Sequence, residues 1–480
     1  MIHSTKKGQL SVEILFFGAL TVVFITGLVF LAVAFFQTAS RGVNRAQAFA
    51  IAEAGVEYYR WHLAHAPADF TDGTGGPGPY THPYYNKDGV EIGQFVLDIT
   101  PPSLGSTVVI VRSTGKVNAD PSIARMIEVK FAVSSFARYA IALNNSVRFG
   151  EGTEVFGEIF SNGGIRFDGL AHNLVQSAQQ SYDDPDHGGA NEFGVHTHKT
   201  TADPLPPAAV PDRPDVFMAG RNFPVPALDF TRITQDLASL KAQASSSGLY
   251  FASSTAYGYE LALATSGAYT VYRVDELTPR PPGCTNTSNE PNWGTWSVES
   301  ETSIASGTLA TSSIFFFEDD VWVRGQVGGR RVTVASGRFP DNPSTRSSIT
   351  VNTNLLYTNY DGTDAIALIA QNDFNVGLFS DDILRIDAAI VAQNGRVGRH
   401  YYQAPSSQSQ ADKCGPTTNR ARITLYGSLI SNQRYGFGFT DLTGYLERVL
   451  IYDPNLLYSP PPSFPLTSDE YVQISWTELQ

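Results

Sequence analysis

Cysteine is almost absent from this chain of 480 residues, which has only Cys284 and Cys414. The sequence therefore allows at most one disulfide within the chain. Both cysteines lie in polar stretches rich in Gly, Pro and Ser that a covalent link would hold together, so we expect them to pair outside the membrane. Two unrelated thiols are the alternative, because sequence alone does not determine pairing.

Charge is also scarce, and its balance is acidic. Charged residues make up 16% of the chain, and the formal net charge is −13. A nucleic-acid-binding surface is normally basic, so we expect no nucleic-acid partner. The sequence also lacks a Gly-Lys-Ser/Thr phosphate loop, a dinucleotide fingerprint and a nucleophile elbow, and we predict neither a cofactor nor an enzyme. Abundant Gly, Tyr and Phe with little Met fit a β-rich, secreted head behind a membrane helix.

The longest apolar run, residues 14–36, contains no charged residue. As an α-helix it would be about 35 Å long, enough to cross a bilayer core of about 30 Å. It is too long for a cleaved secretory signal, whose apolar core is short and is followed by small residues. A plain membrane anchor explains the length and places Lys6 and Lys7 in the cytoplasm. It does not explain Gly8, nor Glu13, whose charge at the edge of the run is costly unless it is paired.

The order Lys-Gly, then Gln-Leu-Ser-Val-Glu, then an apolar helix resembles the start of type IV prepilins and their pilin-like relatives. The resemblance implies that a prepilin peptidase cuts after Gly8 and leaves Gln9 as an N-methylated first residue. It also implies that Glu13, the fifth residue of the mature chain, neutralises the terminal amine of a neighbouring subunit during filament assembly. Opposite charges in a low dielectric cost far less paired than alone. The family usually has Phe or Met after the cut, where this chain has Gln9.

We expect a leader at residues 1–8 and one helix over residues 9–65, which continues beyond the membrane run. Between residues 41 and 63, apolar side chains recur every three or four positions, as on one face of a helix: Phe49, Ala52, Val56, Tyr59 and Leu63. This helix contains four glycines: Gly18, Gly27, Gly42 and Gly55. They could let the helix melt locally as it leaves the membrane, or they could let helices pack closely in lipid.

Apolar residues alternate with polar ones after a Gly/Pro-rich loop at residues 66–89. The alternation predicts antiparallel strands with one buried face near residues 95–99, 108–111 and 127–133. The resemblance to pilins implies that such a small sheet packs on the second half of the helix. We place this domain at residues 66–135.

A degenerate repeat occupies much of the remaining chain: two apolar residues, a small residue and then amides. Its copies start at Ile159, Leu368, Ile390 and Leu429. Short strands with small inward residues at a fixed period predict a parallel β-helix in which the amides stack at a turn; a β-sandwich is the alternative. The predicted fold class is α+β, mostly β: a long N-terminal membrane-spanning helix, a small antiparallel sheet and a C-terminal parallel β-helix with an insertion.

The repeat also sets the expected order of parts along the chain. The apolar segment 449–453 and the triple proline at 460–462 are expected to cap the open end of the stack. We expect the first coils at residues 136–171, an insertion with a loop and a helix at 172–305, and the main stack with its cap at 306–480.

Two groups of residues could carry chemistry. His187, His196 and His198 lie close together, and His-x-His can bind zinc. No cysteine or nearby carboxylate completes a strong pattern, so we predict no metal and place these histidines in a variable surface loop. Carboxylates on the proposed coils could act as acid, base or calcium ligands in a polysaccharide-cleaving enzyme, although Asp is also favoured where strands turn: Asp319, Asp320, Asp381, Asp382 and Asp387.

The leading functional hypothesis is a minor or tip subunit of a type IV pilus-like surface filament, adhesive through its β-helix head. Its expected partners are the cytoplasmic membrane, where the precursor crosses once with the head outside, the prepilin peptidase, other pilin-like subunits, and a surface glycan or protein ligand. One alternative is a membrane-tethered polysaccharide hydrolase or lyase, which would gather Asp381, Asp382 and Asp387 in one groove. Another is a pseudopilin of a secretion system, which has the same kind of N-terminus.

Overall fold

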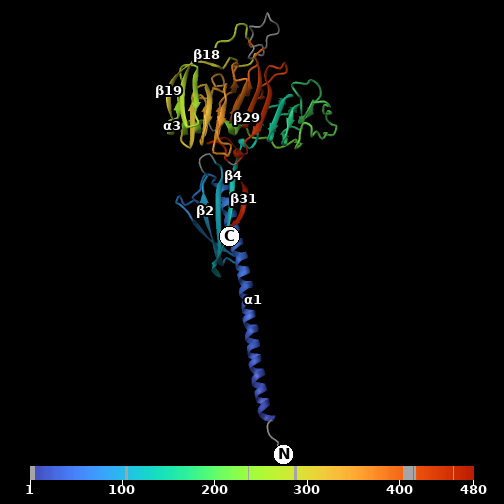
Figure 1. The fold of residues 1–480 in the computed structure, drawn as a ribbon, viewed down its shortest axis with the longest axis vertical. Helices are drawn as coiled ribbons and strands as arrows, with labels where there is room; N and C mark the ends of the chain where they lie inside the picture. The colour runs from blue at the N-terminus through green and yellow to red at the C-terminus, as the bar shows by residue number, and fades with distance from the viewer. Residues whose placement is uncertain are drawn as a thin grey trace, which may run out of the picture. The chain divides into compact units, whose positions relative to one another are not determined.

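The computed structural model describes residues 6–102, 106–235, 237–285, 289–403, 414–415, 418–457 and 459–479. The chain divides into two compact units. The helix–sheet unit comprises Met1–Pro101, Val109–Ala132 and Glu470–Gln480, and the coil unit comprises Pro102–Val108 and Val133–Asp469. A long apolar helix, a small antiparallel sheet and a large, mainly parallel sheet account for most of the structure (Figure 1). The predicted fold class is confirmed.

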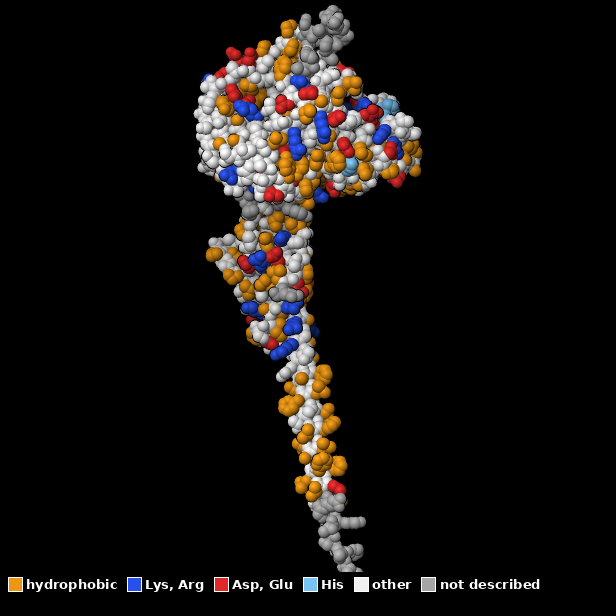
Figure 2. All heavy atoms as spheres, in the orientation of Figure 1, with side chains coloured by type: hydrophobic (Ala, Val, Ile, Leu, Met, Phe, Trp, Pro, Cys, Tyr) orange, Lys and Arg blue, Asp and Glu red, His pale blue; other side chains and the backbone are white. Residues whose placement is uncertain are grey.

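Helix α1 (Lys6–His65) has 60 residues and is therefore about 90 Å long. Its first half exposes apolar side chains (Figure 2), and Phe24 and Phe30 are 70% and 71% exposed. Among the described residues, this is the helix that is long and apolar enough to cross a membrane. The hydroxyls of Thr21 and Thr26 each donate a hydrogen bond of 2.7 Å to the carbonyl four residues earlier. These polar groups are thus satisfied within the helix, as a lipid environment requires.

The second half of α1 packs on a five-stranded sheet with the order β1-β2-β3-β4-β31. Its strands are β1 (Tyr80–Tyr85), β2 (Glu91–Thr100), β3 (Val109–Val117), β4 (Asp120–Ser135) and β31 (Leu466–Leu479). The strands predicted from alternation correspond to β2, β3 and β4, whereas β1 and β31 were not predicted. The predicted helix face is confirmed for four residues that are buried against the sheet: Ala52, Val56, Tyr59 and Leu63.

Two glycines let helix and sheet approach closely. A Cβ atom on Gly115 of β3 would lie 2.0 Å from the Ala48 carbonyl oxygen and 2.5 Å from the Ala52 nitrogen. On the helix side, a Cβ atom on Gly55 would lie 2.3 Å from Ser113 Oγ. Gly55 therefore serves close packing within the chain. Added Cβ atoms at the other three helix glycines would meet no described atom within 4 Å: Gly18, Gly27 and Gly42.

The coil unit is built around a ladder of parallel strands that contains the predicted repeat. Leu368 pairs with Ile390, and Ile390 pairs with Leu429, so three of the predicted copies stand in register. The ladder runs through β16 (Tyr250–Phe251), β20 (Ser312–Phe317), β22 (Arg331–Ser336), β25 (Ala365–Ala370), β27 (Ile383–Ala392), β29 (Asn419–Ser431), β5 (Ile141–Leu143), β8 (Ile159–Ser161), β11 (Val175–Ser177) and β15 (Arg221–Asn222).

Further strands complete the sides of the coils. A second ladder contains β21 (Val321–Val327), β24 (Leu355–Tyr357), the first half of β27, β29, β30 (Gly444–Tyr452), β7 (Thr153–Phe156) and β10 (Leu170–Ala171). A third side contains β23 (Ile349–Thr350), β26 (Phe374–Val376) and β28 (Val397–Arg399), and, in the early coils, β6 (Val147–Phe149), β9 (Ile165–Phe167) and β14 (Val195–His196). The chain thus winds as a parallel β-helix, which excludes the β-sandwich.

The last coil of the chain stacks directly on the first. Leu429 of β29 pairs with Ile141 of β5, and β30 pairs with β29 on one side and β7 on the other. Figure 1 shows the early coils, in green tones, beside the orange and red strands. The expectation that residues 449–453 cap an open end is therefore wrong, because both edges of β30 are already paired.

The predicted insertion at residues 172–305 also differs from the structure. Strands β11, β14 and β15 lie in it and continue the stack. At the opposite end, β17 (Gly258–Leu263) pairs with β21 and is followed by antiparallel β18 (Ala268–Leu277) and β19 (Val298–Thr308). Helices α2 (Thr231–Gln235) and α3 (Leu237–Ser247) lie between β15 and β16, near the predicted helix, and the small pair β12 (Ser181–Tyr182) and β13 (Glu192–Phe193) lies between β11 and β14. The coils within residues 172–305 were not predicted, because their strands lack the motif of two apolar residues, a small residue and amides.

Both apolar residues of the motif are buried, on opposite faces of the strand. Leu368 belongs to the inner core, whereas its neighbour Ile369 belongs to a second cluster that includes Leu237 and Leu240 of α3. The amides form the predicted ladder at the turn: Asn144 Nδ2 donates to Asn432 Oδ1, and Asn162 Nδ2 donates to Asn144 Oδ1, each at 2.7 Å. Two adjacent apolar residues in the motif therefore indicate a strand that is buried on both faces.

Candidate functional site

The residues predicted to direct processing and assembly lie at the start of α1. Gly8 and Gln9 fall within its first turns, although their side chains, like residues 1–5, lie outside the described structure. Glu13 is exposed between Val12 and Ile14, which are themselves 65% and 64% exposed. A carboxylate is thus presented on an apolar helix surface. Cleavage after Gly8 and the pairing of Glu13 with a neighbouring amine stay predictions.

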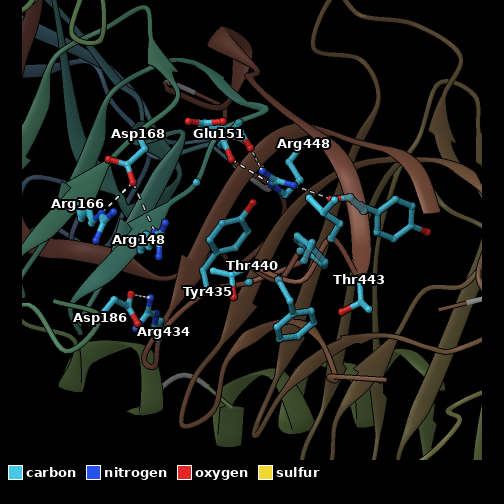
Figure 3. A pocket seen from close by; sticks show the side chains of 18 of the residues that line it. Arg148, Glu151, Arg166, Asp168, Asp186, Arg434, Tyr435, Thr440, Thr443 and Arg448 are labelled. Atoms are coloured by element: carbon cyan, nitrogen blue, oxygen red, sulfur yellow. Dashed lines mark hydrogen bonds and ion pairs between the residues drawn. The ribbon is translucent and has the colours of Figure 1, made fainter. Parts of the chain in front are cut away.

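A pocket of about 720 Å³ opens on the coil unit and combines arginines with aromatic rings (Figure 3). Its walls come from the early coils, from the segment between β29 and β30, from the start of β30, and from Glu290 and Arg396. Sequence analysis did not predict this pocket. The cationic and aromatic side chains that line it are Arg148, Arg166, Lys199, Arg396, Arg434, Arg448, Tyr435, Phe437, Phe439 and Tyr445.

The arginines of this pocket are held in place by neighbouring acids and carbonyls. Arg166 Nε donates to Asp168 Oδ2 at 2.8 Å, and Arg148, its register partner on β6, lies 3.5 Å from the same oxygen. Arg434 makes two hydrogen bonds to Asp186. Figure 3 shows these groups on one side of the pocket. Acids line the pocket as well, so it favours polar ligands that bond to both kinds of group, and the rings add stacking surfaces.

The structure brings carboxylates to the histidine cluster. His198 Nε2 lies 3.3 Å from Glu192 Oε1, and His187 Nδ1 lies 3.0 Å from the same atom. His196 Nε2 lies 3.5 Å from Asp184 Oδ2. The expectation that no nearby carboxylate accompanies these histidines is therefore wrong, because the β12–β13 pairing folds Asp184 and Glu192 back towards β14.

Two members of this cluster are deeply buried. The side chain of His196 is 0% exposed and that of Asp184 is 2% exposed. Within the described structure, neither His196 Nε2 nor Asp184 Oδ2 has a hydrogen-bond partner. Burial lowers the pKa of His196, which keeps its ring neutral near pH 7.

The carboxylates proposed for catalysis do not gather in one groove. Asp387 is buried and accepts hydrogen bonds from Arg385 Nε at 2.8 Å and from the Tyr360 hydroxyl at 2.7 Å. Asp382 accepts one from the Ala421 amide at 2.9 Å, and Asp381 one from a backbone amide at 3.3 Å. None of these three acids lines the pocket. Asp381 and Asp382 accept these hydrogen bonds just before β27, and Asp387 accepts them within β27.

Cys284 and Cys414 are joined by a disulfide. Both are buried, in a small apolar cluster with Leu378 and Tyr402. The bond thus links the segment between β18 and β19 to the segment that precedes β29, across 130 positions of sequence.

Comparison with known proteins finds similarity to solved structures only. No protein-family model matches the chain, and no curated protein matches it. The structure is similar to the crystal structure of the competence-associated pilin ComZ from Thermus thermophilus, over 91% of this chain and 98% of that chain. The identity is 13% and the TM-score is 0.28. At these values the similarity does not establish a shared function.

Proposed function

We propose that this chain is a pilin-like subunit of a surface filament, which enters the cytoplasmic membrane as a precursor and is cleaved after Gly8. The observation that carries the proposal is the two-part helix α1. Its first half exposes apolar side chains and one carboxylate, Glu13, while its second half is buried on a small sheet. Exposed apolar surface on this scale requires lipid or other helices around it.

The position of Glu13 supports an assembly role. A carboxylate at the edge of an apolar surface is costly unless a cation neutralises it. Cleavage after Gly8 would create such a cation, the amine of Gln9, on every subunit. Helices packed side by side would then offset the charge of Glu13 on one subunit with the amine of the next.

The size of the coil unit supports a minor or tip position. It comprises Pro102–Val108 and Val133–Asp469, far more of the chain than the small sheet. Subunits that repeat closely along a fibre would crowd such bulky units against one another. A subunit present in few copies, or at the end of the fibre, avoids this crowding and leaves the pocket accessible to an adhesive ligand such as a surface glycan.

Substitution of Glu13 tests the assembly role. We expect Glu13→Ala and Glu13→Gln to lower the amount of chain in sheared filaments at least tenfold, with the amount in the membrane fraction unchanged. Glu57→Ala is the matched control, because Glu57 is an exposed acid in the docked half of α1, 3.3 Å from Arg60. Filament incorporation of both Glu13 variants at the wild-type level would contradict the proposal.

A polysaccharide hydrolase is less well supported. Asp381, Asp382 and Asp387 already accept hydrogen bonds from neighbouring groups, and they lie outside the pocket.

A further inference from the structure

We propose that the coil unit binds a Zn²⁺ ion through Asp184, His196 and His198, beside the arginine-lined pocket. This inference is independent of filament assembly, because it rests only on side chains of the early coils.

The spacing of the ligand atoms fits a tetrahedral ion. One ligand atom from each of Asp184, His196 and His198 lies within 4.8 Å of the other two, and Asp184 Oδ2 is 3.5 Å from His196 Nε2. Zinc binds imidazole nitrogen and carboxylate oxygen at about 2.0–2.2 Å, so ligand atoms around it stand about 3.4 Å apart. An inward shift of at most about 1.4 Å between ligand atoms brings the cluster to this spacing.

Burial gives the second, independent observation. His196 and Asp184 are 0% and 2% exposed, and His196 Nε2 and Asp184 Oδ2 lack hydrogen-bond partners within the described structure. Buried polar atoms are normally paired. The other ring nitrogen of His196, Nδ1, lies 3.3 Å from the Phe193 carbonyl oxygen. Donation from Nδ1 to that oxygen orients the ring and leaves the Nε2 lone pair free for a metal, as is common for metal-bound histidine.

Glu192 can supply the fourth ligand, because its carboxylate shares a cluster of ligand atoms with His198. Its side chain is 2% exposed, and its Oε1 lies 3.3 Å from His198 Nε2. His187 also contacts this oxygen but is 51% exposed, at the outer edge of the cluster. We therefore assign His187 to the edge of the site rather than to its ligands.

Arg166 is the cation beside the cluster. Its Nη1 lies 3.5 Å from Asp184 Oδ2, while its Nε donates to Asp168 at 2.8 Å. When the ion binds, the guanidinium can stay on Asp168 and leave Asp184 to the metal. Imidazole ligands select zinc-like transition metals over Ca²⁺, which prefers oxygen ligands only.

The ion would fix the edge of the pocket. Asp184 precedes β13, and His196 and His198 lie in and just after β14, so a shared metal ties these segments together. His198 and Asp186 line the pocket, and Asp186 holds Arg434. Zinc would thus stabilise the position of Arg434 on this side of the pocket.

The test uses the full-length chain in detergent micelles, stripped of metal with a chelator and titrated with Zn²⁺ against a chromophoric competitor. We expect one Zn²⁺ per chain by elemental analysis and no retention of Ca²⁺. His196→Ala and Asp184→Asn should each weaken Zn²⁺ affinity at least about 100-fold, more than the loss typical of outer-shell changes. His172→Ala is the matched control, because His172 pairs with Glu154 in the same early coils, apart from the cluster, and should leave affinity unchanged.

Circular dichroism verifies that each variant is folded, and Asp184→Asn, which keeps the shape of the side chain, carries the test if His196→Ala does not fold. Less than about 0.1 Zn²⁺ per wild-type chain would overturn the proposal. Full Zn²⁺ affinity in folded Asp184→Asn would also overturn it. Loss of affinity in His187→Ala with affinity retained in His196→Ala would overturn the assigned ligands.

Discussion

Replacing Gly115 with alanine tests the docking of α1 on the small sheet. The added Cβ would lie 2.0 Å from the Ala48 carbonyl oxygen, and both of its closest contacts are backbone atoms of the helix. Since ordinary contact begins near 3.4 Å, helix and strand must separate by about 1.4 Å. Overpacking of this kind costs about 1–3 kcal/mol. That cost corresponds to an increase of about 5- to 150-fold in the population of the undocked helix.

Hydrogen exchange measured by mass spectrometry on the chain in detergent reports this opening locally. We expect faster amide exchange over residues 48–63 in Gly115→Ala, with exchange in the coil unit unchanged. Gly55→Ala should show a smaller effect, because its three closest contacts are side-chain atoms of Ser113 and Phe95 rather than backbone atoms. Gly42→Ala is the control, since its Cβ meets no described atom within 4 Å and alanine favours helix by about 1 kcal/mol. Wild-type exchange in Gly115→Ala would refute the docked arrangement.

Three further predictions concern the coil unit. Ile390→Ala should lower the stability of the coil unit by about 2–5 kcal/mol, because Ile390 is fully buried in the ladder. Ile383→Ala, on the same strand but 67% exposed, should change the melting temperature little. Equal shifts in melting temperature for the two variants would contradict the register of the strand. Burial raises the pKa of Asp320 to about 6, so the folded protein holds the proton of this carboxyl more tightly than the unfolded protein does. About 3 kcal/mol of stability is therefore lost as the pH rises from about 3.8 through 6. Asp320→Asn should remove this loss, seen as a flatter dependence of melting temperature on pH between 4 and 7, and an unchanged slope would argue against it. Replacing Cys284 and Cys414 with serine should cost about 2–5 kcal/mol, measured against the wild type without reductant, and an unchanged melting temperature would exclude a stabilising bond.

The long helix and the main coils were predictable because their signals are local. An apolar run of membrane length, an alternating strand or a motif such as Leu368–Asn372 depends on residues a few positions apart. The segment Ile141–Asn144 departs from the motif, because Leu143 stands where the copies have a small residue, yet it pairs in register with the copy at Leu429 and joins the first coil to the last.

Pairings between distant segments left no such signal. Strand β31 enters the small sheet, where Glu478 pairs with Arg125 across more than 350 residues of sequence. Nothing in the pattern of either strand identifies its partner. Asp184 and Glu192 likewise could not be placed near the histidines from the sequence. Their approach depends on the pairing of β12 with β13, and strands of two residues are too short to predict. The pocket was missed for this reason as well, since its arginines come from separate coils.

The mature N-terminus tests the central claim most directly. Intact-mass and N-terminal peptide analysis of the chain, isolated from membranes and from sheared filaments of cells that contain a prepilin peptidase, identifies its first residue. We predict that filament-associated chain begins at Gln9, so that Glu13 becomes its fifth residue. Filaments whose chain begins at Met1, with no product that begins at Gln9 in either fraction, would contradict a pilin-like subunit and leave a membrane-tethered β-helix protein.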